Sequence, residues 1–437
     1  MGTSQKPDRV VVVGAGMVGL STAWHLQEQG VEVTVLDREG VAAGSSWGNA
    51  GWLTPALTLP LSEPSVLTYG LKTMFDPASP LYIPFSAKPS LIRFLLGFAR
   101  HCTPGKWREA MAVFSEINSI GLDAYDEISE ASVASTREAP TSGGGTLTRG
   151  RGVSEPTKAA EPFLAGFKSL KDREGLIHEF EGIRDTGGQV DFDLLDAQEI
   201  RALEPTLGDG VKAGIQIHNQ RFIDPPSFMD SLADSVRSRG AEIVTGFDVA
   251  DIREHAAGVD VVGSDGRVES ADAVVIANGA WLGGLAKKFG VKRVVQAGRG
   301  YSFTVKPQAM PTHPIYFPTQ RVACTPLGDR FRVAGTMEFR DADAPLEPRR
   351  IKAIIEAASP LFTGIDWDDR QEEWVGSRPC TTDGLPLIGA TRSPRVHVAG
   401  GHGMWGVALG PLTGKMLAGQ MCGEQPHALM RHFDPLR

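Results

Sequence analysis

The chain has 437 residues, of which 41% are hydrophobic and 22% charged, as is usual for a soluble globular protein. Its length allows one large or two medium domains. The 44 basic and 52 acidic residues leave a net charge of −8, which argues against nucleic acid as a partner because phosphate neutralisation requires a basic face. The 51 glycines suggest many tight turns and close approaches of the backbone to a ligand.

Cysteine usage and hydropathy argue against further classes of protein. Cys102, Cys324, Cys380 and Cys422 lie far apart, without a CxxC pair or zinc-ligand spacing, so we expect free thiols and no metal site. The start, MGTSQKPDRV, lacks the apolar core and cleavage site of a signal peptide, and no run of 18 apolar residues occurs. These features predict a cytoplasmic protein without a membrane-spanning helix.

The first elements form a β-α-β unit. An apolar β-branched run, Arg9–Val13, predicts a strand, the amphipathic segment Met17–Gln29 predicts a helix, and Val31–Leu36 predicts a second strand that ends at Asp37. Strands joined by such a crossover are parallel and need helices on their faces.

The middle of the chain is less regular. Residues 53–104 are Pro-rich and suit a layer of loops and helices over a cleft. The apolar cluster Leu91–Phe98 in this stretch has two open interpretations: packing under the cleft, or peripheral contact with a membrane that holds a quinone pool. Residues 141–158 have a linker-like composition, although GTLTR within them is compatible with a short strand.

Strand and helix signals return in the second half of the chain. A helix is predicted at Pro226–Arg239 and is ended by Gly240, and a final helix is predicted from Met404 to Met421. Strands are predicted at Glu242–Val244, Val259–Val262, Ala273–Ile276, Gly300–Val305, Phe331–Ala334 and Val396–Ala399.

The strongest motif is the GAGMVG sequence between the first strand and the first helix. Gly14 permits a tight turn, Gly16 lets the backbone approach a pyrophosphate, and Gly19 lets helix and strand pack closely. Asp37, at the end of the next strand, accepts hydrogen bonds from ribose hydroxyls and disfavours a 2′-phosphate. The motif therefore predicts binding of FAD or NAD in preference to NADP, with the pyrophosphate at a helix N-terminus.

Four further segments carry a family resemblance: GSSWGNAG (44–51), VVIANGAW (274–281), GSRPCTTDGLPLIG (376–389) and AGGHGMWG (399–406). With GRGYSFTV (298–305) and RVAGTMEF (332–339), they resemble the FAD-dependent D-amino-acid oxidase and glycine oxidase superfamily, and within it the bacterial D-amino-acid dehydrogenase branch. The resemblance covers nearly the whole chain and is weak only between Pro104 and Asp185.

The resemblance implies a fold and a division into domains. The fold is α/β, with a doubly wound, Rossmann-like FAD-binding domain and an inserted α+β substrate domain built on a mixed sheet. The FAD-binding domain is discontinuous and comprises residues 1–60, 219–298 and 378–437. The substrate-binding domain comprises residues 61–218 and 299–377.

The resemblance also implies non-covalent FAD. A cysteine that anchors flavin in sarcosine oxidases aligns near Gly376, and Cys380 is offset from that position. The GSSWGNAG loop is expected against the flavin, Val249 at the adenine, and the N-terminus of the final helix at the flavin pyrimidine ring, where it stabilises negative charge. The expected cofactor contacts are Gly14, Ala15, Gly16, Met17, Val18, Gly19, Asp37, Arg38, Ser45, Ser46, Asn49, Ala50, Gly51, Val249, Asn278, Gly279, Trp281, Gly401, Gly403, Met404, Trp405 and Gly406.

Three residues are candidates for catalysis or substrate binding. Arg378 aligns with an arginine that binds the substrate carboxylate in the resembled enzymes, where a guanidinium makes two parallel hydrogen bonds. Tyr301 is expected to line the pocket, with a core aromatic as its alternative, and His402 is a hydrogen-bond donor to flavin or a structural histidine. Met404 stands where glycine oxidase has a second arginine, so the exact substrate of that enzyme is not implied.

The implied activity is oxidative deamination of a small amino acid, with a D-amino acid favoured. A hydride passes from the α-carbon to flavin N5, and the imino acid formed is hydrolysed to a keto acid and ammonia. A quinone or dioxygen is the second electron acceptor. Two alternatives stay open: a secondary-amine oxidoreductase acting on sarcosine, proline or hydroxyproline, and a flavin-binding protein without catalysis.

Overall fold

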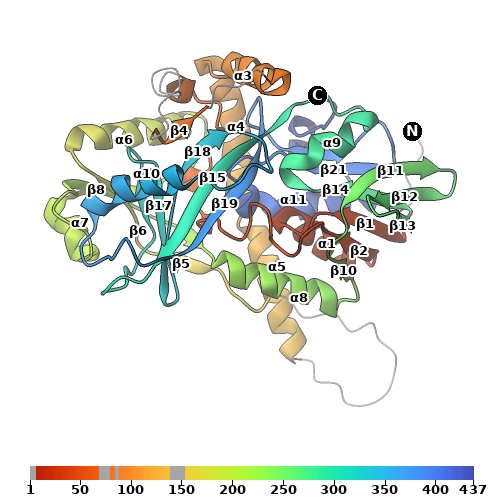
Figure 1. The fold of residues 1–437 in the computed structure, drawn as a ribbon, viewed down its shortest axis with the longest axis horizontal. Helices are drawn as coiled ribbons and strands as arrows, with labels where there is room; N and C mark the ends of the chain where they lie inside the picture. Colours follow the sequence, from red (N-terminus) through yellow and green to blue (C-terminus); the bar gives the residue numbers. More distant parts are fainter. Residues whose placement is uncertain (1–5, 68–78, 84–87, 138–152) are drawn as a thin grey trace.

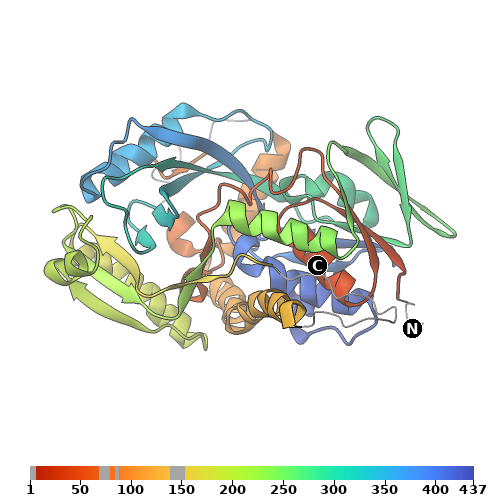
Figure 2. The same ribbon diagram turned by 90° about the horizontal axis from the view of Figure 1, so that it is seen from below.

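The computed structural model describes residues 6–67, 79–83, 88–137 and 153–437. Two large sheets lie side by side and form two halves of the molecule (Figure 1), which are again seen next to each other from below in Figure 2. Within the described ranges, no helix is long and apolar enough to cross a membrane.

The first half is built on a six-stranded sheet of order β10-β2-β1-β14-β21-β20. All neighbours are parallel except β20 and β21. The strands are β10 (Glu242–Val244), β2 (Glu32–Leu36), β1 (Arg9–Val13), β14 (Ala273–Ile276), β21 (Val396–Gly400) and β20 (Leu387–Ala390).

Both faces of this sheet are covered, which explains the unbroken apolar runs of its strands. Alternation in β1 directs Val10 and Val12 into one core and Val11 and Val13 into another. The first core is shared with α1 (Met17–Glu28), α8 (Pro225–Ser238) and α11 (Gly406–Met421). The second is shared with α9 (Leu282–Ala286) and the antiparallel strands β11 (Val249–His255), β12 (Gly258–Gly263) and β13 (Val268–Ala271).

The second half is built on a mixed nine-stranded sheet. Its order is β19-β15-β18-β17-β16-β6-β8-β7, with β4 paired to β18. The pairs β16–β6 and β18–β4 are parallel and the other pairs antiparallel. The strands are β19 (Arg370–Thr381), β15 (Val295–Val305), β18 (Arg330–Phe339), β17 (Val322–Leu327), β16 (Ile315–Phe317), β6 (Phe163–Phe167), β8 (Ala213–Ile217), β7 (Phe192–Asp196) and β4 (Leu81–Tyr82).

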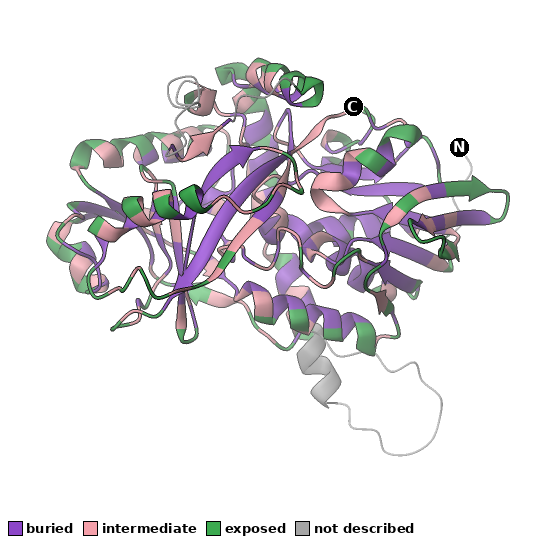
Figure 3. Cartoon of the chain, viewed as in Figure 1, coloured by how far each residue is buried: buried purple, intermediate pink, exposed green. Residues whose placement is uncertain are grey.

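The remaining elements cover this second sheet and join the halves. The helix α10 (Pro348–Ala358) packs through Ile351 and Ile354 against β15 and β18, which are largely buried (Figure 3). A small antiparallel sheet joins β3 (Trp52–Leu53), β9 (Gln220–Phe222) and β5 (Lys158–Ala160). The other helices are α3 (Pro89–His101), α4 (Pro104–Ile120), α5 (Asp123–Arg137), α6 (Leu170–Asp185) and α7 (Ala197–Leu203).

The predicted elements agree with the structure where periodicity was strong. The β-α-β unit, the helix ending before Gly240 and the predicted strands all occur, with ends shifted by a few residues and with β15 and β18 longer than expected. The final helix begins at Gly406, two residues later than predicted. The GTLTR segment lies outside the described residues, and α3 contains the apolar cluster Leu91–Phe98.

The helix α3 bears out the layer expected between residues 53 and 104. Its Leu91, Phe94 and Phe98 are buried in a core with Phe339 of β18, whereas Ile92 and Leu96 are exposed. The helix therefore packs on the second half of the molecule through one apolar face. Contact of the exposed Ile92 and Leu96 with a membrane stays a prediction.

Candidate functional site

Of the three glycines in the turn between β1 and α1, two are required by the packing of the protein itself. Gly14 has φ +115°, and a Cβ there would lie 2.5 Å from the carbonyl oxygen of Ala277. A Cβ at Gly19 would lie 1.9 Å from the carbonyl oxygen of Gly14. At Gly16 a Cβ would meet only Ser46 Oγ, at 3.4 Å, so the protein itself leaves room there. The space beside Gly16 is therefore available to a ligand.

Asp37 stands at the carboxyl end of β2 and fixes this turn. Its Oδ2 accepts a hydrogen bond of 2.8 Å from the backbone N–H of Ala15, and its Oδ1 accepts 2.9 Å bonds from the N–H groups of Glu39 and Gly40. A carboxylate has about four acceptor positions, so one remains. Asp37 also lines a cavity, so this acceptor is available to a ribose hydroxyl there.

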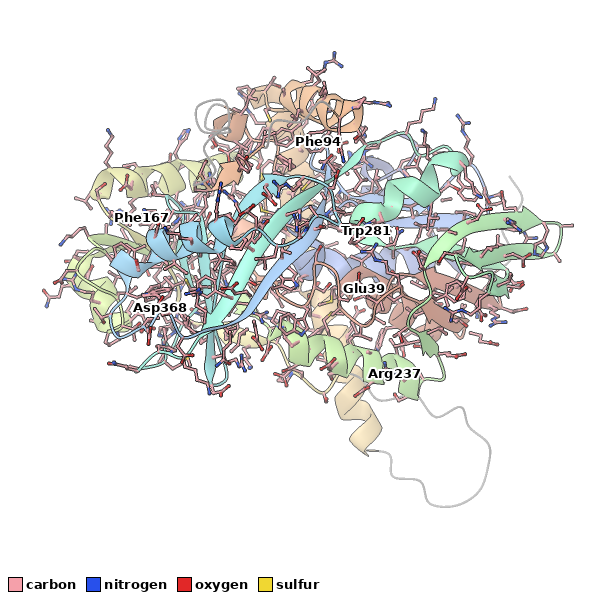
Figure 4. All side chains as sticks on the ribbon, in the orientation of Figure 1. Glu39, Phe94, Phe167, Arg237, Trp281 and Asp368 are labelled. Atoms are coloured by element: carbon pink, nitrogen blue, oxygen red, sulfur yellow. The ribbon has the colours of Figure 1, made fainter. Side chains whose placement is uncertain are left out.

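A cavity of about 460 Å³ runs from this turn along the carboxyl ends of the parallel strands to the start of α11. Figure 4 shows Glu39 and Trp281, two of its lining residues, near the middle of the molecule. Arg38 lies 3.9 Å above the ring of Trp281, and both side chains bond to Asp343. The predicted residues that line this cavity are Gly14, Gly16, Met17, Val18, Asp37, Arg38, Ser45, Ser46, Asn49, Val249, Asn278, Gly279, Trp281, Arg378, His402, Gly403, Met404 and Gly406.

Two lining side chains carry buried polar atoms without a partner among the described residues. These atoms are Oδ1 of Asn278 and Nδ1 of His402. The Nε2 atom of His402 bonds to Thr413 Oγ1 at 2.9 Å, and burial lowers the pKa of His402 to about 4, so the ring is neutral at physiological pH. Unpartnered buried polar atoms are costly, so a polar ligand that bonds to them is expected. The residues fit a dinucleotide in this respect.

The GSSWGNAG loop is held in place by the second sheet. Ser302 of β15 donates a 2.8 Å hydrogen bond to the carbonyl oxygen of Gly48, and buried Arg332 of β18 donates to the carbonyl oxygens of Trp47 and Asn49. Ser46 Oγ accepts a 3.1 Å bond from the N–H of Met17. The loop thus connects the first turn of α1 to the nine-stranded sheet, and its geometry depends on both halves.

A second cavity of about 240 Å³ adjoins the first. It lies between the GSSWGNAG loop and the strands β16 to β19, and its walls include the aromatic side chains of Trp52, Tyr316, Trp374 and Trp405. Both cavities share Asn49, Arg378 and Met404 as lining residues. The first cavity is long and carries the dinucleotide features, whereas the second is smaller and suits a small molecule placed next to the cofactor.

Arg378 stands at this junction without a carboxylate partner. It lies on β19 beside Gly298 and Gly300 of β15, and its Nη1 donates a long hydrogen bond of 3.5 Å to the carbonyl oxygen of Thr336. No ion pair to Arg378 is found in the part of the chain that the structure describes, and burial lowers the pKa of its guanidinium. A half-buried guanidinium that lacks an anion is available to bind one.

Several predicted site residues lie outside the first cavity. Ala50 and Trp405 line the second cavity instead. Four predicted residues line neither cavity: Ala15, Gly19, Gly51 and Gly401. They shape the turns of the backbone. A Cβ at Gly51 would lie 2.2 Å from the carbonyl oxygen of Ile223, and a Cβ at Gly401 would lie 2.8 Å from Thr381.

The expectation that Tyr301 lines the pocket is not met. Successive strand residues point to opposite faces, so Gly300 and Ser302 lie against Arg378 and the GSSWGNAG loop while Tyr301 and Phe303 enter the core under α10. Tyr301 is fully buried, and its hydroxyl donates a 2.5 Å hydrogen bond to Glu338. The core interpretation considered from the sequence is the one that the structure supports.

Sequence reasoning missed residues that shape the site through packing. A Cβ at Gly300 would lie 2.2 Å from the guanidinium carbon of Arg378, so this glycine makes room for the arginine. Trp374 is enclosed in the same way by Gly48 and Gly376, where a Cβ would lie 2.1 and 2.0 Å from its ring. In the sequence only the glycines themselves could have indicated this packing, because a sequence does not show which side chain lies against a glycine.

The fold and the site together define a dinucleotide-binding protein of the doubly wound class, with a substrate-sized cavity beside its cofactor cavity. The chain belongs to the family of FAD-dependent oxidoreductases: residues 9–420 match the family model described as "FAD dependent oxidoreductase". The predicted cofactor FAD and the predicted class of enzyme are confirmed by this match.

Relatives in sequence are similar over almost the full length. The chain is 29% identical over 425 residues to the D-amino acid dehydrogenase of Cereibacter sphaeroides (strain ATCC 17029 / ATH 2.4.9), covering 96% of this chain and 92% of that protein. It is 28% identical to the D-amino acid dehydrogenase of Rhizorhabdus wittichii, covering 96% and 97%. These similarities agree with the family resemblance found from the motifs.

Solved structures confirm the predicted fold. Glycine oxidase from Geobacillus kaustophilus superposes with a TM-score of 0.71 at 19% identity, with 99% of each chain covered. Iminodiacetate oxidase from Chelativorans sp. BNC1 gives a TM-score of 0.70 at 19% identity, with 98% of this chain and 99% of that chain covered. The α/β fold with a doubly wound domain and an inserted mixed-sheet domain is therefore shared with these enzymes.

Proposed function

We propose that this oxidoreductase is an amino-acid dehydrogenase or oxidase that acts on the CH–NH₂ or CH–NH group of a small amino acid, with a D-amino acid favoured. The observation that carries the proposal is Arg378, a half-buried guanidinium without an anionic partner among the described residues, at the junction of the two cavities. The names of the two similar dehydrogenases support the same substrate class.

The first cavity is assigned to FAD, bound without a covalent link. The turn at Gly14 and Gly16 would hold the pyrophosphate, Asp37 the ribose and Val249 the adenine, all of which line the cavity. Cys380 is buried and lines neither cavity, so it offers no attachment point. When bound, FAD supplies a two-electron acceptor for a hydride from the substrate α-carbon.

The N-terminus of α11 is assigned to the flavin ring. Gly403, Met404 and Gly406 line the cavity where the helix begins, and the helix has no side-chain cap. Free backbone N–H groups there favour negative charge. Neutral His402 lines the same cavity, and its unpartnered Nδ1 could exchange a hydrogen bond with the ring.

Arg378 would orient the substrate. Two parallel hydrogen bonds from its guanidinium to the α-carboxylate fix the α-carbon next to the first cavity. The substrate R–CH(NH₂)–COO⁻ loses two electrons and two protons to form an imino acid. Water then converts the imino acid to a keto acid and ammonia, and the electrons pass to a quinone or dioxygen.

The proposal assigns FAD binding and substrate binding to two different parts of the chain. Residues 1–60, 219–298 and 378–437 would form the FAD part, and residues 61–218 and 299–377 the substrate part. The strands of the six-stranded sheet fall within the first set, and those of the nine-stranded sheet fall within the second, except that β15 and β19 run across a boundary. Arg378 lies at one of these crossings.

An anaerobic spectroscopic screen tests the proposed function. Purified protein with its FAD is mixed with D-amino, L-amino, N-methyl and cyclic amino acids, and the flavin absorbance is followed. Bleaching by D-amino acids is the expected result, whereas bleaching only by sarcosine, proline or hydroxyproline identifies a secondary-amine oxidoreductase. A flavin that no amino compound bleaches would contradict the proposal and favour a protein without catalysis.

A further inference from the structure

The second cavity contains a group of ionisable side chains that the proposed reaction does not use. Glu63, Glu179, Tyr316 and Arg321, here called the distal group, line this cavity and are absent from the lining of the first. Glu179 comes from α6, Tyr316 from β16 and Arg321 from the turn that follows it. The distal group therefore lies away from the opening at Arg378 that the two cavities share.

The distal group has one more acidic side chain than it has cationic ones. Burial and the neighbouring charge of Glu63 raise the pKa of Glu179 to about 7, and Arg321 acts in the opposite direction. Tyr316 and both glutamates raise the pKa of Arg321, so its charge is firmly held. When both carboxyl groups are ionised, one guanidinium balances only one of them, and a negative charge remains in the cavity.

The carboxyl group of Glu179 is open to a ligand. Within the described part of the chain it has neither a hydrogen bond nor an ion pair, although it lines the cavity. Arg321 lines the same cavity, and its positive charge is stabilised by Tyr316 and by both glutamates. A cation and an unpartnered acid that line one cavity set the polarity of this end of it.

Aromatic side chains form part of the walls of the second cavity. Trp52 donates its indole N–H to Thr325, and Trp405 donates its own to the carbonyl oxygen of Leu59. Their polar edges are therefore occupied, and their rings present aromatic surface to the cavity along with Tyr316. Aromatic faces attract ammonium and guanidinium groups electrostatically.

We propose that the distal group binds the side chain of the amino-acid substrate, and that this side chain ends in a cation, an ammonium or a guanidinium. The inference rests on the proposed function, because the α-carboxylate on Arg378 determines which end of the substrate points toward Glu179. One added positive charge neutralises the acidic excess of Glu63 and Glu179. A second carboxylate would gain Arg321 but would face both glutamates.

A comparison of lysine with norleucine, which has the same carbon chain but no terminal ammonium, tests the inference. The catalytic efficiency kcat/KM is measured for lysine and for norleucine, in the enantiomer that the enzyme oxidises, with the FAD-loaded wild type and Glu179→Gln. We expect lysine to be preferred by the wild type and to lose roughly 30-fold in the variant, as for one broken buried charge pair. Norleucine should change less than about threefold. The control Glu181→Gln makes the same change on α6 at a side chain that is 62% exposed and lies outside both cavities, and it should alter neither substrate.

A binding measurement separates this inference from the proposed function. The compound 6-aminohexanoate has the carboxylate and the terminal ammonium of lysine but no α-amine, and hexanoate lacks both amines. Calorimetry should show tighter binding of 6-aminohexanoate than of hexanoate, with the difference lost in Glu179→Gln. If that difference is found although no amino acid bleaches the flavin, the proposed function fails and the cation site stands.

Two results would overturn the inference and leave the proposed function intact. In the first, amino acids bleach the flavin but norleucine equals or exceeds lysine, and hexanoate binds as tightly as 6-aminohexanoate. In the second, glutamate is preferred over glutamine and the preference is lost in Arg321→Gln, which would assign the distal group to an anionic side chain. Unchanged FAD content and melting temperature in each variant show that the comparison concerns recognition alone.

Discussion

Gly300→Ala is a perturbation that moves Arg378 without removing its charge. The added Cβ would lie 2.2 Å from the guanidinium carbon and from Nη2 of Arg378, whereas an ordinary contact begins at 3.4 Å. The guanidinium must therefore shift by at least the difference, about 1.2 Å. It is the far end of a flexible side chain, so the shift costs the fold little, and alanine suits a strand better than glycine. A misplacement of about 1 Å in a substrate-positioning group can lower the rate roughly 100-fold.

The assay compares kcat/KM for an amino acid and for the amine that lacks its carboxylate. We expect Gly300→Ala to lose about 100-fold with the amino acid and little with the amine, while FAD content and melting temperature stay unchanged. Gly283→Ala is the matched control, since nothing lies within 4 Å of a Cβ at that position. An unchanged kcat/KM for the amino acid in Gly300→Ala would show that the position of Arg378 does not matter and would refute the reasoning.

Three other predictions concern the cofactor and stability. Gly16→Val should give folded but largely FAD-free protein, because the space beside Gly16 is open to a ligand; normal flavin absorbance in the purified variant would contradict this. Acid or heat should release all FAD into the supernatant, and flavin left on the precipitated chain would show a covalent bond. Burial lowers the folded-state pKa values of His25 to about 3 and of His397 and His402 to about 4, below the usual 6.5. The unfolded chain therefore takes up these protons first, and the stability that the neutral rings provide above pH 6.5 should be lost as pH falls toward 4, at up to about 4 kcal/mol per pH unit for three protons. Urea unfolding at a series of pH values measures this slope, and a flat profile between pH 6.5 and 4 would count against three buried neutral histidines.

Local patterns predicted the first half of the molecule well. The apolar run of β1, the turn at Gly14 and the acid at Asp37 are contiguous in sequence, and both faces of the resulting sheet are covered, so its strands have one unbroken pattern. The helix α8 was also predicted, since its apolar stripe is regular and Gly240 ends it with φ +96°. Here local chemistry and the final packing favour the same structure.

The second half and the detail of the site depend on contacts between distant segments. The strands β6, β7 and β8 and the helix α6 were not predicted, and β6 and α6 belong to the region where the family resemblance was weak. Tyr301 was predicted at the pocket because its motif resembles a substrate-domain strand of the family, but the strand alternation directs it into the core. Gly300 and Glu179 became visible only once β19 and α6 were placed beside the cavity.

The central claim is that Arg378 binds the carboxylate of an amino acid next to FAD, and a substrate-pair measurement on Arg378→Ala tests it most directly. The efficiency kcat/KM is determined for an amino acid and for its decarboxylated amine, in the wild type and in the variant. We predict a loss of about 30-fold to several thousand-fold for the amino acid, equivalent to roughly 2–5 kcal/mol, and almost none for the amine. Arg378→Lys should recover only part, because an ammonium cannot make the bidentate contact. Equal losses for both compounds would contradict the account, since they would show that Arg378 does not recognise the carboxylate.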